Sequence, residues 1–310
     1  VIVALELGEQ VRRRLAEQVD EHVEAPAVRH ADHALLDRMA AARQLLSAVG
    51  VRVPKIEDRD DEIPALLFED FGDTLLADAL PHLDGAARLR IYAEAGRFAG
   101  RIARLGTPRV VEGHALAFPR LGRARLRWEL ALFATQDVAG RRGVTDPGLF
   151  RDLAGLSDVI CTTLAAATPV LAHRDFHARN LMLLDNGALG VLDFQDTLLA
   201  PPGYDLASLV RDPYVEPPPE LERAAADAFA EAAKLAGPPL DDPLFPWVAL
   251  QRDLKAIGTY AFQARARHRT RFLEAIPPAE RLALKAVERL PDDVRTTARH
   301  VLARLGFGAH

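Results

Sequence analysis

The segment His173–Asn180 carries the side chains in this chain that are best suited to catalysis. It reads His-Arg-Asp-Phe-His-Ala-Arg-Asn, and Asp193 follows thirteen residues after Asn180. A carboxylate such as that of Asp175 can accept the proton of a hydroxyl group, and an Asn and an Asp supply the hard oxygen donors that Mg²⁺ prefers. Phosphoryl transfer needs one such base and such metal ligands, because the rest of its catalysis is positioning and charge compensation. The spacing therefore predicts metal-dependent phosphoryl transfer.

A predicted β-hairpin brings the two metal ligands together. Residues 180–184 and 189–194 read as short strands, and the Asn-Gly pair between them is the strongest short hairpin signal. Asn180 and Asp193 then lie side by side at the open end of the hairpin, and Asp175 faces the acceptor. Each of these polar residues alone is usually a turn cap, but capping does not explain the three together in this order.

The elements around this hairpin fall into two parts. Residues 1–7, 51–56 and 65–68 predict strands, with a polar turn between the last two. Residues 31–49 predict a helix, because apolar residues recur every three or four positions and a glycine follows. From residue 74 onward helical patterns dominate, including helices expected from Asp84 to Leu105 and over residues 121–138.

Composition limits the class of protein. The 310 residues are 49% hydrophobic and 27% charged, as in soluble globular proteins. The formal net charge of −5 gives no reason to expect nucleic acid or a membrane as a partner. The single cysteine, Cys161, excludes an internal disulfide and a cysteine-rich metal site, and we expect it to be a small apolar residue on a helix. Without an apolar run of about 20 residues or a signal peptide, a cytoplasmic protein is expected.

Together the motif and the elements resemble a known family. The segments His173–Asn180 and Val191–Phe194 resemble the aminoglycoside phosphotransferase and choline kinase superfamily, which shares the protein-kinase fold. The resemblance implies an α+β, two-lobed fold with a small β-rich N-lobe at residues 1–70 and a large, mainly helical C-lobe at residues 71–310. It further implies ATP and Mg²⁺ as cofactors, Asp175 as the catalytic base, Asn180 and Asp193 as ligands of the metal and its nucleotide, and His173 as a structural residue.

Two further segments match motifs of the same family. Pro201–Ala207 is similar to the motif that follows the metal strand, where the aspartate, here Asp205, accepts hydrogen bonds from the backbone of the catalytic loop. Leu66–Gly72 resembles the hinge between the lobes, where the end of a strand offers backbone groups to adenine. The Glu69 carbonyl and the Phe71 amide are therefore the candidates for nucleotide contact.

A narrower resemblance concerns the acceptor. Asp193–Asp196, Leu126–Phe133 and Gln251–Gly258 are similar to segments of the anomeric kinases for N-acetylmuramic acid and N-acetylglucosamine, which phosphorylate the C1 hydroxyl of the sugar. This implies a small-molecule sugar as the partner, contacted by Gln195, Asp196, Gln251 and Arg252. Arg252 or Lys255 can meet the carboxylate of N-acetylmuramic acid. Basic residues outnumber acidic ones after position 250, as expected beside a neutral or carboxylate-bearing sugar. Residues 205–242 are instead rich in acidic side chains, so an acidic wall, which a polycationic aminoglycoside would need, stays an alternative.

The chain departs from the family pattern at its beginning. Residues 1–7 resemble the strand that normally carries a phosphate-binding lysine, yet they contain none, and no glutamate occurs between His33 and Gly50. The hairpin that covers the phosphates is expected ahead of Val1, so the phosphate loop of the N-lobe is incomplete here. Three alternatives stay open: a kinase for another small hydroxyl compound (an aminoglycoside, choline or a hydroxy amino acid), an inactive kinase-shaped binding module, and a metal-dependent hydrolase.

Overall fold

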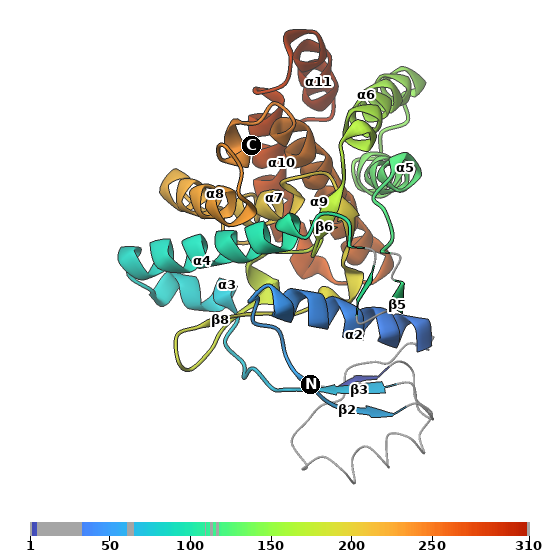
Figure 1. Cartoon of the computed structure of the whole chain (residues 1–310). Helices are drawn as coiled ribbons and strands as arrows, with labels where there is room; N and C mark the ends of the chain where they lie inside the picture. Colours follow the sequence, from blue (N-terminus) through green and yellow to red (C-terminus); the bar gives the residue numbers. More distant parts are fainter. Residues whose placement is uncertain are drawn as a thin grey trace.

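A small antiparallel sheet lies at one end of the molecule, and a large helical body forms the rest, with helix α2 between them (Figure 1). The computed structural model describes residues 2–4, 33–60, 65–108, 110–111, 114–115 and 118–308. The predicted α+β, two-lobed fold class is confirmed. The predicted boundary at residue 70 stays a prediction.

The strands are short and gather in small sheets. They are β1 (Ile2–Ala4), β2 (Ile56–Asp60), β3 (Ala65–Phe68), β4 (Val110–Val111), β5 (His114–Ala115), β6 (Val170–Ala172), β7 (Leu181–Leu183), β8 (Leu189–Val191) and β9 (Leu198–Ala200). The end sheet has the order β1-β3-β2, and the pairs β4-β5, β6-β9 and β7-β8 are separate two-stranded ladders. The predicted hairpin of residues 180–194 is therefore present as β7-β8.

One strand differs from its prediction. Residues 51–55 are not in a strand, and β2 instead covers the charged segment that was expected to be a turn. Because β2 pairs with β3 at the edge of the described sheet, its central side chains point into solvent, and charge is tolerated there. The apolar side chains of Val51 and Val53 are buried in the core without belonging to a strand.

The helical body contains long helices joined by short segments. The α-helices are α2 (His33–Ala48), α3 (Leu76–Ala79), α4 (Gly85–Arg104), α5 (Arg123–Leu132), α6 (Pro147–Ala166), α7 (Tyr204–Val210), α8 (Pro219–Ala233), α9 (Phe245–Ala266), α10 (Ile276–Val287) and α11 (Asp292–Arg304). The 3₁₀ segments are η1 (Leu80–His82), η3 (Ala178–Asn180), η4 (Phe194–Asp196), η5 (Pro239–Asp241) and η6 (Thr270–Ala275), and η2 (Phe133–Arg141) is a π-helix. No helix in the described part of the chain is long and apolar enough to cross a membrane.

Helix α9 runs through the centre of this body. Of its 22 residues, 16 are buried, including the polar Gln251, Arg252 and Asp253. It packs against α5, α6, α7, α10 and η2. A helix that is buried on nearly all sides can hold polar side chains only if they find partners inside the protein. Cys161, on α6, is also buried, as expected, and burial raises the pKa of its thiol to about 11.

Helices α4 and α8 approach each other closely at small residues. Asp84 caps α4 as predicted, because its side chain accepts a hydrogen bond from Ala87 N at 2.6 Å. At Gly96 a β-carbon would lie only 2.0 Å from the carbonyl oxygen of Ala225 on α8. The backbones of the two helices can therefore meet at this point only with glycine.

The crossing of α4 and α8 gives a prediction about stability. We expect Gly96→Ala to lower the free energy of unfolding by roughly 3 kcal/mol, because the added methyl group forces the helices apart. Gly155→Ala is the matched control: it lies within α6, where a β-carbon would meet no atom within 4 Å, and it should raise stability by about 0.5–1 kcal/mol. Urea unfolding of both variants measures this difference. Equal midpoints for the two variants would contradict the close approach.

Candidate active site

The catalytic loop follows strand β6 and is held by a buried carboxylate. Asp205, in the first turn of α7, accepts hydrogen bonds from the backbone N of His173 at 2.7 Å and of Arg174 at 2.9 Å. Arg174 has a φ of 86°, which non-glycine residues rarely adopt, and these bonds fix that conformation. Burial raises the pKa of Asp205, although the two backbone N–H groups favour its charged form. The His173 ring Nε2 lies 2.7 Å from Leu192 O and joins the loop to the metal hairpin.

The hairpin brings Asn180 and Asp193 into contact. Leu192 N donates to Asn180 O at 2.9 Å, which extends the ladder beyond strands β7 and β8. Asn180 Nδ2 lies 3.2 Å from Asp193 Oδ2 and donates to the backbone oxygen of Asp175 at 2.9 Å. Asp193 has a φ of 62°, a second strained backbone position at this site. The three residues that the sequence singled out for chemistry thus lie together.

The donor set suits Mg²⁺ rather than a softer metal. Asn180 and Asp193 offer amide and carboxylate oxygens, the ligands that Mg²⁺ prefers, and Mg²⁺ keeps several of its waters. Among the described residues no group of three or more His, Cys, Asp or Glu side chains is arranged to hold a metal ion. Gln195 Nε2 donates to Asp193 Oδ1, so this carboxylate already has a neighbour that orients it.

The carboxylate of Asp175 is paired with a lysine that the sequence analysis did not connect to it. Lys255 Nζ, on α9, lies 2.8 Å from Asp175 Oδ1, and 25% of the Asp175 side chain is exposed. Burial disfavours the charged carboxylate, but the charges of Lys255 and Arg174 outweigh it and hold the pKa of Asp175 well below its usual range. Burial lowers the pKa of His177 to about 3, so its imidazole is neutral and adds no charge beside Asp175.

A cavity of about 260 Å³ is lined both by the predicted metal pair, Asn180 and Asp193, and by the predicted hinge. It is lined by Met39, Pro54, Phe68, Glu69, Phe71, Gly72, Asn180, Leu192, Asp193, Phe194 and Gln195. The lining combines apolar side chains, among them Phe68 and Phe194, with polar ones, among them Asn180 and Asp193. Such a mixed lining suits a ligand that has both an apolar part and a charged part.

Glu69 lies in the cavity wall, but its carboxylate is engaged. Arg52 forms two hydrogen bonds with it, and Lys55 N donates to it at 3.1 Å. The hydrogen bond from Arg52 lowers the pKa of Glu69 to about 2. The Arg52 guanidinium also lies 4.6 Å from the centre of the Phe71 ring. Arg52 thus stiffens the predicted hinge, a role that no sequence signal indicated.

A second polar network lies behind the catalytic loop. Glu129, on α5, is only 1% exposed and accepts hydrogen bonds from Gln251 Nε2 at 2.8 Å and from Arg174 at 3.3 Å. Arg252 Nε donates to Ser208 Oγ at 2.6 Å. Gln251 and Arg252, predicted to contact the sugar, are therefore buried and bound within the protein.

The other two predicted sugar contacts lie at the open side of the site. Asp196 is exposed and pairs with Arg174 Nη1 at 3.3 Å, and Gln195 lies beside Asp193. Glu129 was not predicted as a member of the site, although it belongs to the segment Leu126–Phe133, which resembles the sugar kinases. A carboxylate among apolar residues on a predicted helix was the available signal.

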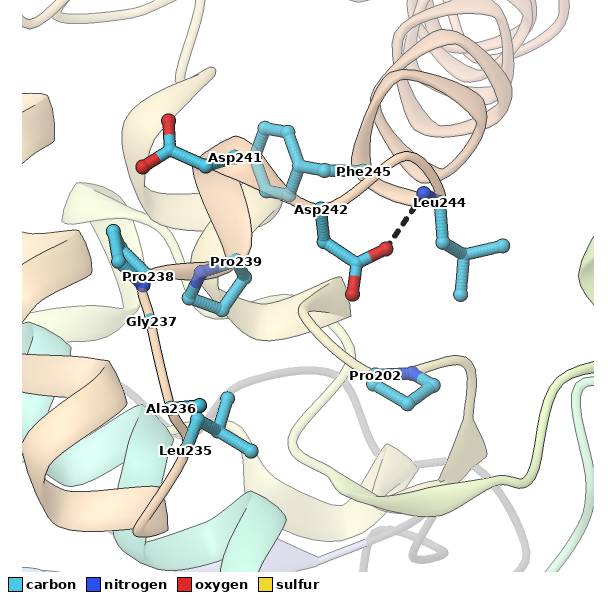
Figure 2. Close-up of a pocket in the computed structure, with 10 residues that line it drawn as sticks. All are labelled: Pro202, Leu235, Ala236, Gly237, Pro238, Pro239, Asp241, Asp242, Leu244 and Phe245. Atoms are coloured by element: carbon cyan, nitrogen blue, oxygen red, sulfur yellow. Dashed lines mark hydrogen bonds between the residues drawn. The ribbon is translucent and has the colours of Figure 1, made fainter.

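A separate cavity of about 480 Å³ lies near the start of α9 (Figure 2). It is lined by Pro202, Leu235, Ala236, Gly237, Pro238, Pro239, Asp241, Asp242, Leu244 and Phe245. Asp242 accepts a hydrogen bond from Leu244 N at 2.7 Å and so shapes the turn into α9. None of the predicted site residues lines this cavity, so it is distinct from the candidate active site.

The sequence matches known proteins over most of its length. The family model described as the phosphotransferase enzyme family (APH) matches residues 23–244. An N-acetylmuramate/N-acetylglucosamine kinase of Pseudomonas aeruginosa is 32% identical over 265 residues, which cover 80% of this chain and 72% of that protein. The kinase of the same name from Neisseria meningitidis is 32% identical over 219 residues, 68% of this chain and 63% of that protein. The chain thus spans only about two thirds of the length of these relatives.

Solved structures with the same fold are more distant in sequence. The gentamicin complex of APH(2″)-IIa superposes with a TM-score of 0.61 at 14% identity, over 89% of this chain and 96% of that one. A choline/ethanolamine kinase family protein from Mesorhizobium loti gives a TM-score of 0.54 at 12% identity, over 87% of this chain and 85% of that one. These similarities confirm the fold, and the family match confirms the predicted superfamily, with which the predicted enzyme class, a small-molecule kinase, agrees. The chain belongs to the phosphotransferase enzyme family.

Proposed function

We propose that the protein transfers the γ-phosphoryl group of ATP to the C1 hydroxyl of N-acetylmuramic acid or N-acetylglucosamine, with Mg²⁺. The observation that carries the proposal is the contact of Asn180 with Asp193 and with the backbone oxygen of Asp175, beside a cavity that Asn180 and Asp193 line together with the predicted hinge. The names of the relatives, at about a third identity, support the sugar. Use of ATP favours a cytoplasmic location.

The residues of the chain divide the chemistry among them. Mg²⁺, held by Asn180 and Asp193, would compensate the charge of the β- and γ-phosphates. The Asp175 carboxylate accepts a hydrogen bond from the acceptor hydroxyl and so directs its oxygen toward the γ-phosphorus. As the new oxygen–phosphorus bond forms and the bond to the ADP oxygen breaks, the hydroxyl proton passes to Asp175.

The electrostatics at Asp175 support an acidic hydroxyl as the acceptor. Lys255 and Arg174 keep this carboxylate ionised and make it a weak base. An anomeric C1 hydroxyl is more acidic than an ordinary alcohol, so a weak base suffices for it.

The position of phosphorylation is directly measurable. We expect that incubation with ATP, Mg²⁺ and either sugar gives a product whose phosphorus couples to the H1 proton in NMR spectra, because C1 carries the reacting hydroxyl. Choline and kanamycin, run in parallel, should give at most slow turnover. Phosphorylation at C6, or rapid turnover of choline or kanamycin without any turnover of the sugars, would contradict the proposal.

A further inference from the structure

One face of helix α9 is joined to the catalytic loop by three polar side chains. They lie at positions 251, 252 and 255, so they point to the same side of the helix. Gln251 donates to Glu129, Arg252 to Ser208 and Lys255 to Asp175. Glu129 and Ser208 in turn both contact Arg174. Glu129 binds the Arg174 side chain, and Ser208 Oγ lies 3.2 Å from the Arg174 carbonyl oxygen. Only Lys255 reaches the predicted base itself.

The two oxygens of the Asp175 carboxylate have different surroundings. Its Oδ1 accepts the hydrogen bond from Lys255 at 2.8 Å. No side chain or backbone group among the described residues donates a hydrogen bond to its Oδ2. The backbone oxygen of Asp175 is fixed separately, by Asn180 Nδ2 at 2.9 Å and by His177 N at 3.1 Å. One carboxylate oxygen is thus held by an ammonium group, and the other is left for a hydroxyl group.

The choice of lysine at this position is informative. The chain has 35 arginines and only four lysines, and the ion pairs of its described surface are made almost entirely by arginine. An arginine binds a carboxylate through a planar fork that tends to occupy both oxygens, whereas the ammonium group of lysine is a compact charge that can bind one oxygen alone. Lys255 therefore binds one oxygen of the Asp175 carboxylate and leaves the other oxygen able to accept a hydrogen bond from the acceptor hydroxyl.

We propose that Lys255 is a positioning residue for phosphoryl transfer, which acts through Asp175 by holding Oδ1 so that Oδ2 points to the acceptor hydroxyl. The proposal rests on the proposed function, in which Asp175 takes the proton of the acceptor. The side chain of Lys255 is only 16% exposed and belongs to the buried central helix, so its position is set by the packing of α9. It holds the base at the correct angle for transfer, and it does not hold the nucleotide.

Three variants test the role of Lys255 in turnover. We expect Lys255→Met to lower kcat by on the order of 10²-fold and to change the KM for ATP by less than about 3-fold, because the base is misaligned while the nucleotide site is intact. Lys255→Arg should recover part of kcat, since it restores the cation but crowds Oδ2. Lys285→Met is the matched control, because Lys285 is an exposed lysine on α10, and it should behave as wild type.

A double-mutant cycle separates this role from a general loss of structure. If Lys255 acts through Asp175, the variant with both Lys255→Met and Asp175→Asn should be no slower than Asp175→Asn alone, within about 3-fold. If kcat of the double variant falls by the product of the two single losses, the proposal is overturned. A wild-type kcat in Lys255→Met would overturn it as well. Absence of kinase turnover by the wild-type protein with every acceptor would instead contradict the proposed function.

The ion pair is also observable without turnover. Because the chain contains four lysines, a protein labelled with ¹³C and ¹⁵N in the lysine side chains gives at most four ammonium signals. The signal that disappears in Lys255→Met should shift in Asp175→Asn, while the other three stay in place. An unshifted signal would mean that the pair does not form in solution and would overturn the proposal even where the kinase activity is normal.

Discussion

Asp193→Asn is expected to abolish turnover almost completely, with a loss in kcat on the order of 10³-fold or more. Asp193 is the anionic member of the predicted metal pair, and several kcal/mol of charge stabilisation depend on the metal that we propose it holds. Asparagine is the appropriate replacement because the residue has a φ of 62°, which asparagine tolerates better than alanine does. Asp193→Ala should give the same loss of turnover together with a small loss of stability.

Two measurements check the assignment of Asp193. Steady-state kinetics should show the loss of kcat, and calorimetry should show that Mg²⁺ no longer strengthens the binding of the nucleotide. Asp185→Asn is the matched control, because Asp185 lies exposed in the turn of the same hairpin and should leave both quantities unchanged. An Asp193→Asn enzyme that is nearly as fast as wild type would rule out Asp193 as a metal ligand.

Asp175→Asn should lower kcat by on the order of 10²–10³-fold and leave the affinity for the nucleotide unchanged. The variant removes the proposed proton acceptor, while Asn180 still binds the backbone oxygen at position 175 and the predicted metal pair stays intact. The ion pair with Lys255 is lost, so we expect the melting temperature to fall by no more than a few degrees.

Nucleotide titration and thermal unfolding of the same Asp175→Asn preparation distinguish the two possible roles. A large loss of turnover with a nearly normal melting temperature is the expected result. If the protein instead unfolds at a much lower temperature, Asp175 holds the loop together and another residue acts as the base.

The local part of the site could be predicted from the sequence. Asp175, Asn180 and Asp193 lie within nineteen residues, and the Asn-Gly turn of one hairpin suffices to bring the last two together. Asp205 was recognised through its motif, and the structure gives it the two backbone hydrogen bonds that such an aspartate makes. Such predictions concern residues that are close together in the sequence, and the spacing of these residues largely determines their local geometry.

The contacts that depend on tertiary packing could not be predicted in this way. Lys255 meets Asp175 across 80 residues, and Gln251 meets Glu129 across 122. The sequence predicted helical patterns from residue 74 onward, but not which face of α9 is buried. The structure buries Gln251 and Arg252, and their contact with the sugar stays a prediction. The charged strand β2 was mistaken for a turn for a related reason, because exposure at a sheet edge permits polar residues that a buried strand would exclude.

The first strand of the chain is where this family normally has a phosphate-binding lysine. Strand β1 reads Ile-Val-Ala and pairs with β3, so the described part of the predicted strand contains no cation. Residues 5–7 of that prediction lie outside the described residues. Arg52, which no sequence signal singled out, binds Glu69 in the wall of the cavity, so the charge of its guanidinium group is compensated there.

The buried thiol on α6 has a practical consequence for spectroscopy. Cys161 is the only cysteine of the chain, and with a pKa of about 11 on the order of one molecule in 10⁴ carries a thiolate at neutral pH. Maleimide reagents should therefore scarcely modify the wild-type protein.

A cysteine introduced on the exposed surface of α4 and another on β2 can then carry a donor and an acceptor dye, and the native Cys161 need not be removed. Energy transfer between the dyes would report, molecule by molecule, whether the distance between the small sheet and the helical body changes when a nucleotide is added.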